Sequence, residues 1–534
     1  MKKFIFTIIA TVAVPIGFFV FLELALKLFQ VGQPRAYFTE IEIDGAPHYQ
    51  DNPFFIEQFY PRSLGITPIA NTFANEPNAN RLRVFVLGGS AARGFPNPNH
   101  GFSRHLEVML KAAFPNKTVE VINTAMTSVN SHVIYETAKS IPGGPADFAI
   151  ILVGNNEVVG PYGPGTYNQN FLSNLNLIRI LQAVRRSRIW QALEYFTAEF
   201  QDRDAKETLR WRGMQMFTDN LVTQDNPQLI HVYDHYQSNL TDTIEILQGR
   251  GMQVLLSSVP VNLRDSAPFA SAHSSNLTPG QIDQWQRHIR QGDLQFKRRE
   301  FTSAIKNFES AIAIDSEFAS THFKLGICYE NTGDFDLAIE HFRLARDYDV
   351  LRFRADSRMN AVIHSVAERL KSPSFHFVDN ASNFARYSAP RAPGWNLLLE
   401  HVHFDFSGNY ALAKEFFRTI TGTLETKPTT KILSADEVAG RIGYPNHGTI
   451  DAMGRLLDMV QAPPFSGQSN HAALVEFINN KGHQLSQSLG SIPEVVVRRQ
   501  ALIRDGHADW WIDFELAELL GHQKDTEASF RHLE

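Results

Sequence analysis

The sequence predicts an α/β protein with a doubly wound parallel sheet of five strands, an all-α insertion and a helical C-terminal region. Three observations predict this fold class. Five short runs rich in β-branched and aromatic residues alternate with helical stretches, a repeat with a period of 34 interrupts the alternation, and helical periodicity resumes beyond about residue 425. Strands that alternate with helices form parallel sheets with helices on both faces.

Length and composition limit the number of domains, the class of partner and the possible disulfides. At 534 residues, with 43% apolar and 20% charged residues, the chain is long enough for about three compact domains. The formal net charge of −6 argues against a nucleic-acid partner, because such a partner needs a basic surface. Cys328 is the only cysteine, so the chain cannot form an internal disulfide, and we expect this residue to be small, apolar and buried.

Residues 1–30 are predicted to form a transmembrane anchor. The uncharged run from Phe4 to Leu22 is about long enough to span a bilayer, and Lys2 and Lys3 before it indicate a cytoplasmic start. A signal peptide cleaved after Ala13 is the alternative, but apolar sequence continues past that point. We therefore expect one uncleaved N-terminal span in a bacterial inner membrane, with the bulk of the chain in the periplasm.

The segment 31–80 is rich in Pro, Asn and aromatic residues and has no sustained period. Such composition is typical of irregular structure. The prediction is an extended linker packed on the domain that follows.

The sheet is predicted to come from two parts of the chain, 81–282 and 356–425. Its five strands are expected at Arg81–Gly89, Thr118–Asn123, Asp147–Gly154, Met252–Val259 and Ser374–Asp379. An open parallel sheet binds ligands beyond the carboxyl ends of its strands, so the functional residues are expected there.

Between the two parts, residues 283–355 contain the repeat. Its two copies align Gly292 with Gly326, and three further pairs agree: Ala304 with Ala338, Phe308 with Phe342, and Ala311 with Ala345. The period and the small residues resemble tetratricopeptide repeats, in which small side chains let paired helices approach closely. Residues 426–534 are predicted to be a similar helical region, cut short at Glu534. Such repeats favour a protein partner.

Polar residues follow the first three strands. Ser90 lies in a Gly-rich turn, where a serine can expose its hydroxyl at the sheet edge or merely cap a helix. Asn123 and Ala125 follow the second strand, and Gly154 and Asn156 follow the third. These residues can supply the hydrogen-bond donors that an oxyanion hole needs.

The stretch "EHVHFDFSGN" follows the fifth strand. Glu400 and His403 have the spacing of a carboxylate that orients a catalytic imidazole. His401 and His403 could instead share one face of a strand and bind zinc, with His132 as a third ligand. Asp405 is expected to be a turn or cap residue rather than the orienting acid.

The stretches "VLGGSAARG", "NTAM", "VGNNE" and "EHVH" resemble, in order, the four blocks of the SGNH or GDSL-type hydrolases. With the expected anchor and the inserted repeats, the chain resembles a membrane-anchored bacterial subgroup. The resemblance covers roughly residues 81–425 and implies a flavodoxin-like sheet. It implies that Ser90 is the nucleophile, His403 the base and Glu400 the orienting acid, with the Ala125 amide and the Asn156 side chain at the oxyanion.

Three positions depart from the family pattern: Gly89 and Glu400 each stand where the family has Asp, and Ala125 stands where it has Gly. The site border is expected to include Gly89, Asn123, Gly154, Asn155, Glu157 and His401, with no metal and no cofactor. The predicted function is a serine esterase acting through an acyl-enzyme on an acyl ester, for which an O-acylated envelope glycan is one candidate. The alternatives are an O-acyltransferase at the same site, or a non-catalytic repeat scaffold for a membrane protein assembly.

Overall fold

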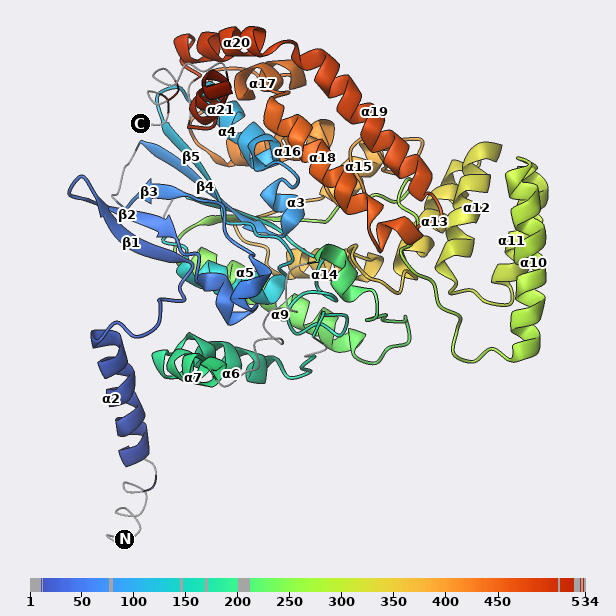
Figure 1. The fold of residues 1–534 in the computed structure, drawn as a ribbon, viewed down its shortest axis with the longest axis horizontal. Coiled ribbons are helices and arrows are strands. Elements are labelled where there is room, and N and C mark those ends of the chain that lie inside the picture. The colour runs from blue at the N-terminus through green and yellow to red at the C-terminus, as the bar shows by residue number, and fades with distance from the viewer. Residues whose placement is uncertain are drawn as a thin grey trace. The chain divides into compact units, whose positions relative to one another are not determined.

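The computed structural model describes residues 11, 13–75, 80–144, 147–168, 171–199, 212–507, 510–522, 529 and 532 (Figure 1). The chain divides into two compact units. The smaller contains Met1–Glu76 and Phe171–Arg212, and the larger contains Pro77–Asn170 and Gly213–Glu534. The division differs from the predicted segments, because helices that follow residue 171 belong with the N-terminal part.

The larger unit is built on a sheet of five parallel strands. The strands lie side by side in the order β5-β4-β6-β7-β8. Their bounds are β4 Arg81–Gly88, β5 Thr118–Asn123, β6 Phe148–Leu152, β7 Gln253–Ser257 and β8 Phe375–Val378. Strand β6 is buried along its whole length, as expected for a parallel strand covered on both faces. The predicted five-stranded parallel sheet is confirmed.

Helices cover both faces of this sheet (Figure 1). Below it in the view lie α5 Ser131–Ser140, α9 Leu229–Gly249 and α14 Ser357–Arg369. Above it lie α4 Phe102–Ala113, α15 Asn380–Ser388 and α16 Phe406–Thr423. Because all five strands run the same way, the segments that follow them meet at one edge of the sheet.

The insertion forms two successive helix pairs, as predicted from the repeat. The helices are α10 Pro279–Lys297, α11 Phe301–Ile312, α12 Ala319–Thr332 and α13 Phe335–Asp347. The two repeat glycines have equivalent surroundings. A Cβ added to Gly292 would lie 2.6 Å from the ring of Phe308, and one added to Gly326 would lie 2.7 Å from the ring of Phe342. These glycines let each phenylalanine pack directly on a helix backbone.

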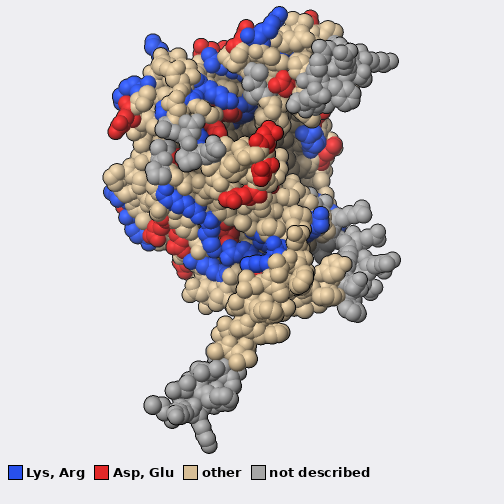
Figure 2. Space-filling view, turned by 90° about the vertical axis from the view of Figure 1, so that its left-hand side faces the viewer, with Lys and Arg blue, Asp and Glu red and all other residues tan. Residues whose placement is uncertain are grey.

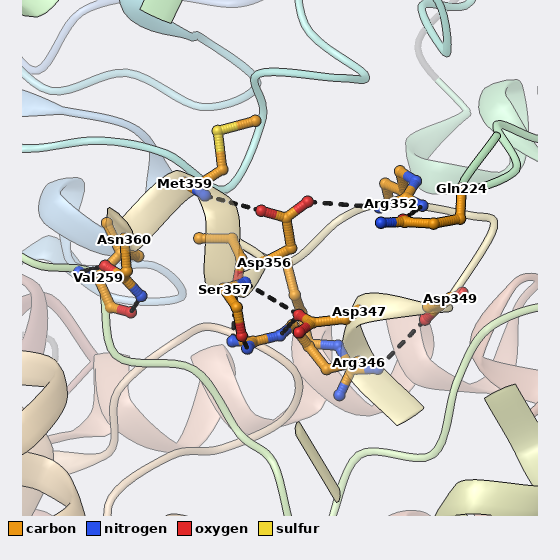
Figure 3. A network of polar contacts seen from close by, with 12 residues as sticks. Gln224, Val259, Arg346, Asp347, Asp349, Arg352, Asp356, Ser357, Met359 and Asn360 are labelled. Carbon is orange, nitrogen blue, oxygen red and sulfur yellow. Dashed lines mark hydrogen bonds and ion pairs between the residues drawn. The ribbon is translucent and has the colours of Figure 1, made fainter. Parts of the chain in front are cut away.

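The chain leaves the insertion through a network of polar contacts (Figure 3). Arg346 at the end of α13 donates hydrogen bonds to Asp347 (2.6 Å) and Ser357 (2.8 Å). The Asn360 side chain in α14 accepts from the Val259 N–H (2.8 Å) and donates to the Val259 carbonyl (3.1 Å). The junction therefore holds the segment after β7 in place.

Residues beyond 425 are helical, as predicted. The helices are α17 Ala435–Ile442, α18 His447–Gln461, α19 His471–Leu489, α20 Ile492–Arg504 and α21 Trp510–His522. Leu456 of α18 and Ile478 of α19 are buried in one apolar cluster with Phe353 and Leu399. Two of the C-terminal helices thus pack against the segment that carries Glu400 and His403.

The smaller unit contains a sheet that the linker prediction for 31–80 missed. Strands β1 Phe38–Ile43, β2 Ala46–Asp51 and β3 Thr72–Ala74 pair antiparallel in that order. Asp44 (φ 51°) and Gly45 (φ 77°) form the turn between β1 and β2. An Asp-Gly pair favours this two-residue hairpin turn because both positions need a positive φ.

The prediction of an N-terminal membrane span is wrong. Among the described residues no helix is long and apolar enough to cross a membrane. Helix α2, Val14–Leu28, has 15 residues and rises about 22 Å, against about 30 Å of hydrocarbon. Its exposed side chains include Val14, Ile16 and Phe18, and no charged side chain is visible on the tan stretch near the bottom of Figure 2. Residues 1–10 and 12 of the predicted anchor lie outside the described residues.

Within the same unit, Glu23 of α2 has a structural partner. Its carboxylate accepts hydrogen bonds from the backbone N–H groups of Arg188 (2.8 Å) and Ile189 (3.1 Å). These groups are at the start of α7 Arg188–Glu199, which follows α6 Leu175–Arg186. Glu23 therefore supplies the acceptor that the first turn of α7 lacks. The predicted inner-membrane location depended on the N-terminal span, and it is contradicted by the same finding.

Candidate active site

Ser90 lies at the carboxyl end of β4, where the chain turns into the short helix α3, Ser90–Arg93. The turn needs Gly88, because a Cβ there would lie 2.2 Å from the Leu152 carbonyl oxygen. Gly89 follows in extended conformation. The Ser90 hydroxyl lies 2.8 Å from Nε2 of His403, which is 313 residues further along the chain.

His403 and Glu400 lie in one loop after β8. The loop is closed by hydrogen bonds from the Leu399 N–H to the His403 carbonyl (2.8 Å) and from the Asp405 N–H to the Leu397 carbonyl (3.0 Å). Oε1 of Glu400 lies 2.5 Å from Nδ1 of His403 and accepts a hydrogen bond from the His403 N–H (2.8 Å). Carboxylate, imidazole and hydroxyl therefore follow one another as in a serine hydrolase triad.

The electrostatics of the loop favour a neutral imidazole. Burial lowers the pKa of His403 below its usual range. With Nδ1–H donated to Glu400, Nε2 is left as the acceptor of the Ser90 hydroxyl. A neutral imidazole that accepts from a serine is the state that a general base needs.

His401, predicted as a border residue and, in the metal alternative, as a zinc ligand, touches the same carboxylate. Its Nδ1 contacts Oε2 of Glu400. The ring is enclosed by Phe269 and Phe465, with ring centroids 5.2 and 5.3 Å away. Burial, followed by the neighbouring His403, lowers the pKa of His401 well below its usual range. Glu400 and His401 are neighbours in the chain, and neither helical nor strand periodicity places adjacent residues on one face. The sequence therefore does not predict this contact.

The metal alternative keeps His401 and His403 but has a different third ligand from the one expected. Ligand atoms of Glu400, His401 and His403 lie within 4.8 Å of one another, so these three could hold a metal ion. His132 is not part of this group. It lies in α5, where Nδ1 is 3.1 Å from the Asn239 amide nitrogen and the ring packs on His235. Glu400 and His403 also form the hydrogen-bonded chain to Ser90. The absence of a metal stays a prediction.

A small cavity opens beside Ser90. It encloses about 310 Å³ of empty space, its opening included. The residues that line it are Gly89, Ser90, Ala91, Val129, Leu152, Val153, Gly154, Asn155, Asn156, Val259 and Phe404. The Asn156 amide donates to the Val129 carbonyl (3.1 Å), and a Cβ on Gly89 would lie 3.3 Å from the Asn156 amide nitrogen. Asn156 is therefore held beside the serine.

Ala125, predicted as the second oxyanion donor, has its amide occupied. The Ala125 N–H donates to Oδ1 of Asn123 (3.0 Å), and the residue is fully buried and does not line the cavity. Asn123 in turn donates to the Ala92 carbonyl (3.1 Å) and the Ser103 hydroxyl (3.0 Å). The conformationally unusual residue of this loop is Ser128, with φ 60°, directly before the lining residue Val129.

Two other border residues hold the loops together. Oδ1 of Asn155 accepts from the Ala355 N–H (3.0 Å), which ties the cavity to the junction after the repeats. Glu157 accepts from the Ser131 N–H (2.9 Å) and hydroxyl (2.7 Å). Burial raises the pKa of Glu157 to about 7, although the Ser131 hydrogen bonds oppose the shift. Both side chains therefore hold backbone segments in place, and Asn155 also lines the cavity whereas Glu157 does not.

Comparisons with known proteins add the following. A tetratricopeptide repeat family model matches residues 319–348, which include most of the second repeat copy. A search among curated proteins finds no match. Among solved structures, the chain is similar to an acetylxylan esterase from Geobacillus stearothermophilus, with 12% identity, 63% of this chain and 93% of that chain covered, and a TM-score of 0.28. A second, the acetyl xylan esterase AlAXEase, has 12% identity, 63% and 98% coverage, and a TM-score of 0.28. Values this low do not establish a family.

Proposed function

We propose that the protein is a serine esterase of the SGNH type that cleaves acyl esters through an acyl-enzyme. The observation that carries the proposal is the unbroken chain from the Ser90 hydroxyl through His403 to the buried Glu400 carboxylate. The strand order β5-β4-β6-β7-β8 supports it, because this is the order of flavodoxin-like sheets, which bind ligands at this edge.

The reaction has two halves. The Ser90 oxygen bonds to the ester carbonyl carbon while His403 takes the hydroxyl proton, and the tetrahedral intermediate breaks its bond to the alcohol oxygen, which receives that proton. Water then bonds to the acyl carbon and gives a proton to His403. The bond to Ser90 breaks, the proton returns to the serine oxygen, and a carboxylic acid leaves.

Glu400 keeps His403 in the tautomer that both halves need and stabilises the imidazolium formed in each. Asn156 is the side-chain donor to the oxyanion, together with the Ser90 amide at the start of α3. Each such donor contributes about 3 kcal/mol to the transition state. Ala125 is a weaker candidate, because its single N–H is bonded to Asn123.

The cavity beside Ser90 suits a short acyl group. Val129, Val153 and Val259 line it, and no charged side chain does. Apolar walls around a space this small favour an acetyl or similarly short group over a long chain.

The repeat helices α10–α13 suit a protein partner. Stacked repeats of this class present extended surfaces that bind other proteins. Docking of a partner there is compatible with esterase chemistry, because the insertion leaves Ser90 and Asn156 on other elements.

The experiment is hydrolysis of p-nitrophenyl acetate, with fluorophosphonate labelling and peptide mapping. We expect labelling at Ser90, loss of hydrolysis to the background rate in Ser90→Ala, and no loss in the control Ser303→Ala, which changes an exposed serine of the repeat. Activity should survive EDTA. A protein that loses activity to EDTA, regains it with zinc and ignores Ser90→Ala would contradict the proposal.

A further inference from the structure

The catalytic loop, residues 399–403, contains no helix or strand. Its shape therefore depends on individual hydrogen bonds to its backbone. The carbonyl groups of Glu400 and His401 both accept from one residue, Asn262, which follows β7. Nδ2 of Asn262 donates to the Glu400 carbonyl (2.9 Å), and the Asn262 N–H donates to the His401 carbonyl (3.0 Å). One residue thus holds two successive peptide groups of the loop.

These peptide groups determine where the Glu400 carboxylate lies. Its Oε1 accepts from the His403 N–H (2.8 Å) and lies 2.5 Å from Nδ1 of the same residue. A rotation of the peptide group between Glu400 and His401 would move the carboxylate away from the imidazole. A displacement of about 1 Å in a catalytic group can lower the rate about 100-fold. Asn262 therefore acts on His403 through the backbone and the carboxylate of Glu400.

Asn262 is itself held in one orientation. It is fully buried, and its Oδ1 accepts from the Asp265 N–H (2.8 Å). Because Oδ1 must face this N–H group, Nδ2 faces the Glu400 carbonyl. The Asn262 carbonyl accepts from Nη1 of Arg354 (3.0 Å), which also donates to the Ser266 carbonyl (2.8 Å). All four polar groups of Asn262 thus have a partner.

Arg354 lies between α13 and α14, where the chain leaves the repeat insertion. Its Nη2 lies 3.2 Å from Oδ2 of Asp349, and both side chains are buried. The Asp349 carboxylate also accepts from the N–H groups of Phe269 (2.9 Å) and Ala270 (3.1 Å). A guanidinium paired in this way directs its remaining donors rigidly. The exit of the insertion therefore fixes the segment 262–270.

The same exit segment reaches the other side of the site. The Ala355 N–H donates to Oδ1 of Asn155 (3.0 Å), and Asn155 lines the cavity beside Ser90. Two adjacent residues, Arg354 and Ala355, are therefore connected to the base and to the cavity. A shift of the exit segment would disturb both.

We infer that Asn262 is a positioning residue for the Glu400–His403 pair, and that Arg354 holds Asn262 from the exit of the repeat insertion. The inference rests on the proposed esterase function. Neither residue lines the cavity beside Ser90, so each acts through the backbone of the catalytic loop.

The first test is Asn262→Leu, which keeps the approximate size of the side chain and removes its donor and its acceptor. With p-nitrophenyl acetate, kcat should fall about 10- to 100-fold at unchanged KM, because His403 is misoriented while the acyl site is intact. Asn380→Leu is the matched control, since Asn380 is equally buried but donates to the Ser257 hydroxyl (2.9 Å). Both variants should lose stability, and the control should keep its kcat. An unchanged kcat in Asn262→Leu, or an equal fall in the control, would overturn the inference.

The second test, Arg354→Lys, leaves Asn262 in place and keeps a charge opposite Asp349. Lysine lacks the planar fork of arginine, so kcat should fall about three- to tenfold, the effect of one lost hydrogen bond. Arg352→Lys is the control, because Arg352 is equally buried in the same segment but donates to the Val222 carbonyl (2.9 Å). Equal kcat values in these two variants would refute the role of Arg354.

The third test needs no turnover and so separates this inference from the esterase proposal. A proton held between an imidazole nitrogen and a carboxylate gives a downfield NMR signal, and the signal of His403 is assigned by its loss in His403→Ala. This signal should remain in Ser90→Ala. Adding Asn262→Leu should broaden or remove it, whereas adding Asn380→Leu should not.

The outcomes of this test are distinct. If the signal behaves as expected but the wild type hydrolyses no ester, the esterase proposal fails and the positioning role stands. If the wild type hydrolyses p-nitrophenyl acetate and the signal is the same with and without Asn262→Leu, the positioning role alone fails.

Discussion

The repeat insertion and the catalytic edge belong to the same compact unit, yet they are held together in opposite ways. In the insertion, α10 to α13 follow one another directly, and an apolar core joins them, with the rings of Phe308 and Phe342 packed on Gly292 and Gly326. At the catalytic edge, Ser90 and His403 are separated by 313 residues and joined by a polar contact, while Glu400 behind them is buried.

The difference indicates that the insertion determines mainly stability, whereas the catalytic edge determines mainly the reaction rate. Packing in the insertion stabilises the fold and touches no reacting group, so changes there should appear in melting curves. The polar contacts at the catalytic edge orient a few groups, so changes there should appear in rates. The two kinds of contact meet at two places. Asn155 joins the cavity to the segment after α13, and Leu399 packs against the C-terminal helices.

The largest expected effect is on the rate. Glu400→Gln keeps the size of the side chain but removes the charge that orients His403, so kcat/KM for p-nitrophenyl acetate should fall by about 10⁴-fold. The melting temperature should change far less than the rate. If Glu400→Gln instead lowered stability and left the residual folded enzyme fully active, the carboxylate would be structural.

The next effect concerns pH and stability at the catalytic edge. Burial raises the pKa of Glu157 to about 7, above its ordinary value of 4.5. Below pH 4.5 both folded and unfolded states hold the proton. As the pH rises toward 7 only the unfolded state loses it, so stability falls by about 3 kcal/mol and is then constant.

Glu157→Gln should abolish this dependence. Denaturant melts of wild type and variant between pH 5 and 8 are the measurement. Parallel losses of stability in the two proteins would show that another group causes the trend.

A smaller effect on the rate should come from His401. His401→Leu removes the contact to Oε2 of Glu400 and should lower kcat by about 10- to 100-fold, the effect of one hydrogen bond to a charged group. His401→Asn places an amide near the Nδ1 position and should recover most of the rate. KM should not change in either variant. Equal losses in the two variants would assign His401 to packing against Phe269 and Phe465.

The smallest expected effect is in the insertion. Gly326→Ala would put a Cβ 2.7 Å from the ring of Phe342, so the helices must separate, and stability should fall by about 1–3 kcal/mol. Gly454→Ala is the matched control, because Gly454 is exposed within α18 and has nothing within 4 Å of its added Cβ. It should stabilise by up to about 1 kcal/mol. A stable Gly326→Ala protein would contradict direct ring-on-backbone packing.

The sequence alone predicts the structural features that depend on residues close to one another in the chain. The five strands, the two helix pairs and the cap formed by Asp405 on α16 all follow from local periodicity or from contacts within a few residues. The Asp-Gly hairpin at residues 44–45 is equally local, but it is indicated by turn chemistry and not by the composition of segment 31–80, from which a linker is predicted.

Tertiary structure decided the rest, because a side chain has a chemical role only after its partners are known. The Ala125 amide is taken by Asn123, His401 reaches the acid rather than a metal ligand set with His132, and Glu23 bonds to the start of α7. Asn262 reaches the catalytic loop, and Arg354 reaches Asn262, only because the chain folds back on itself after the repeats. Such pairings depend on distance and hydrogen-bond competition in space, which spacing along the chain does not encode.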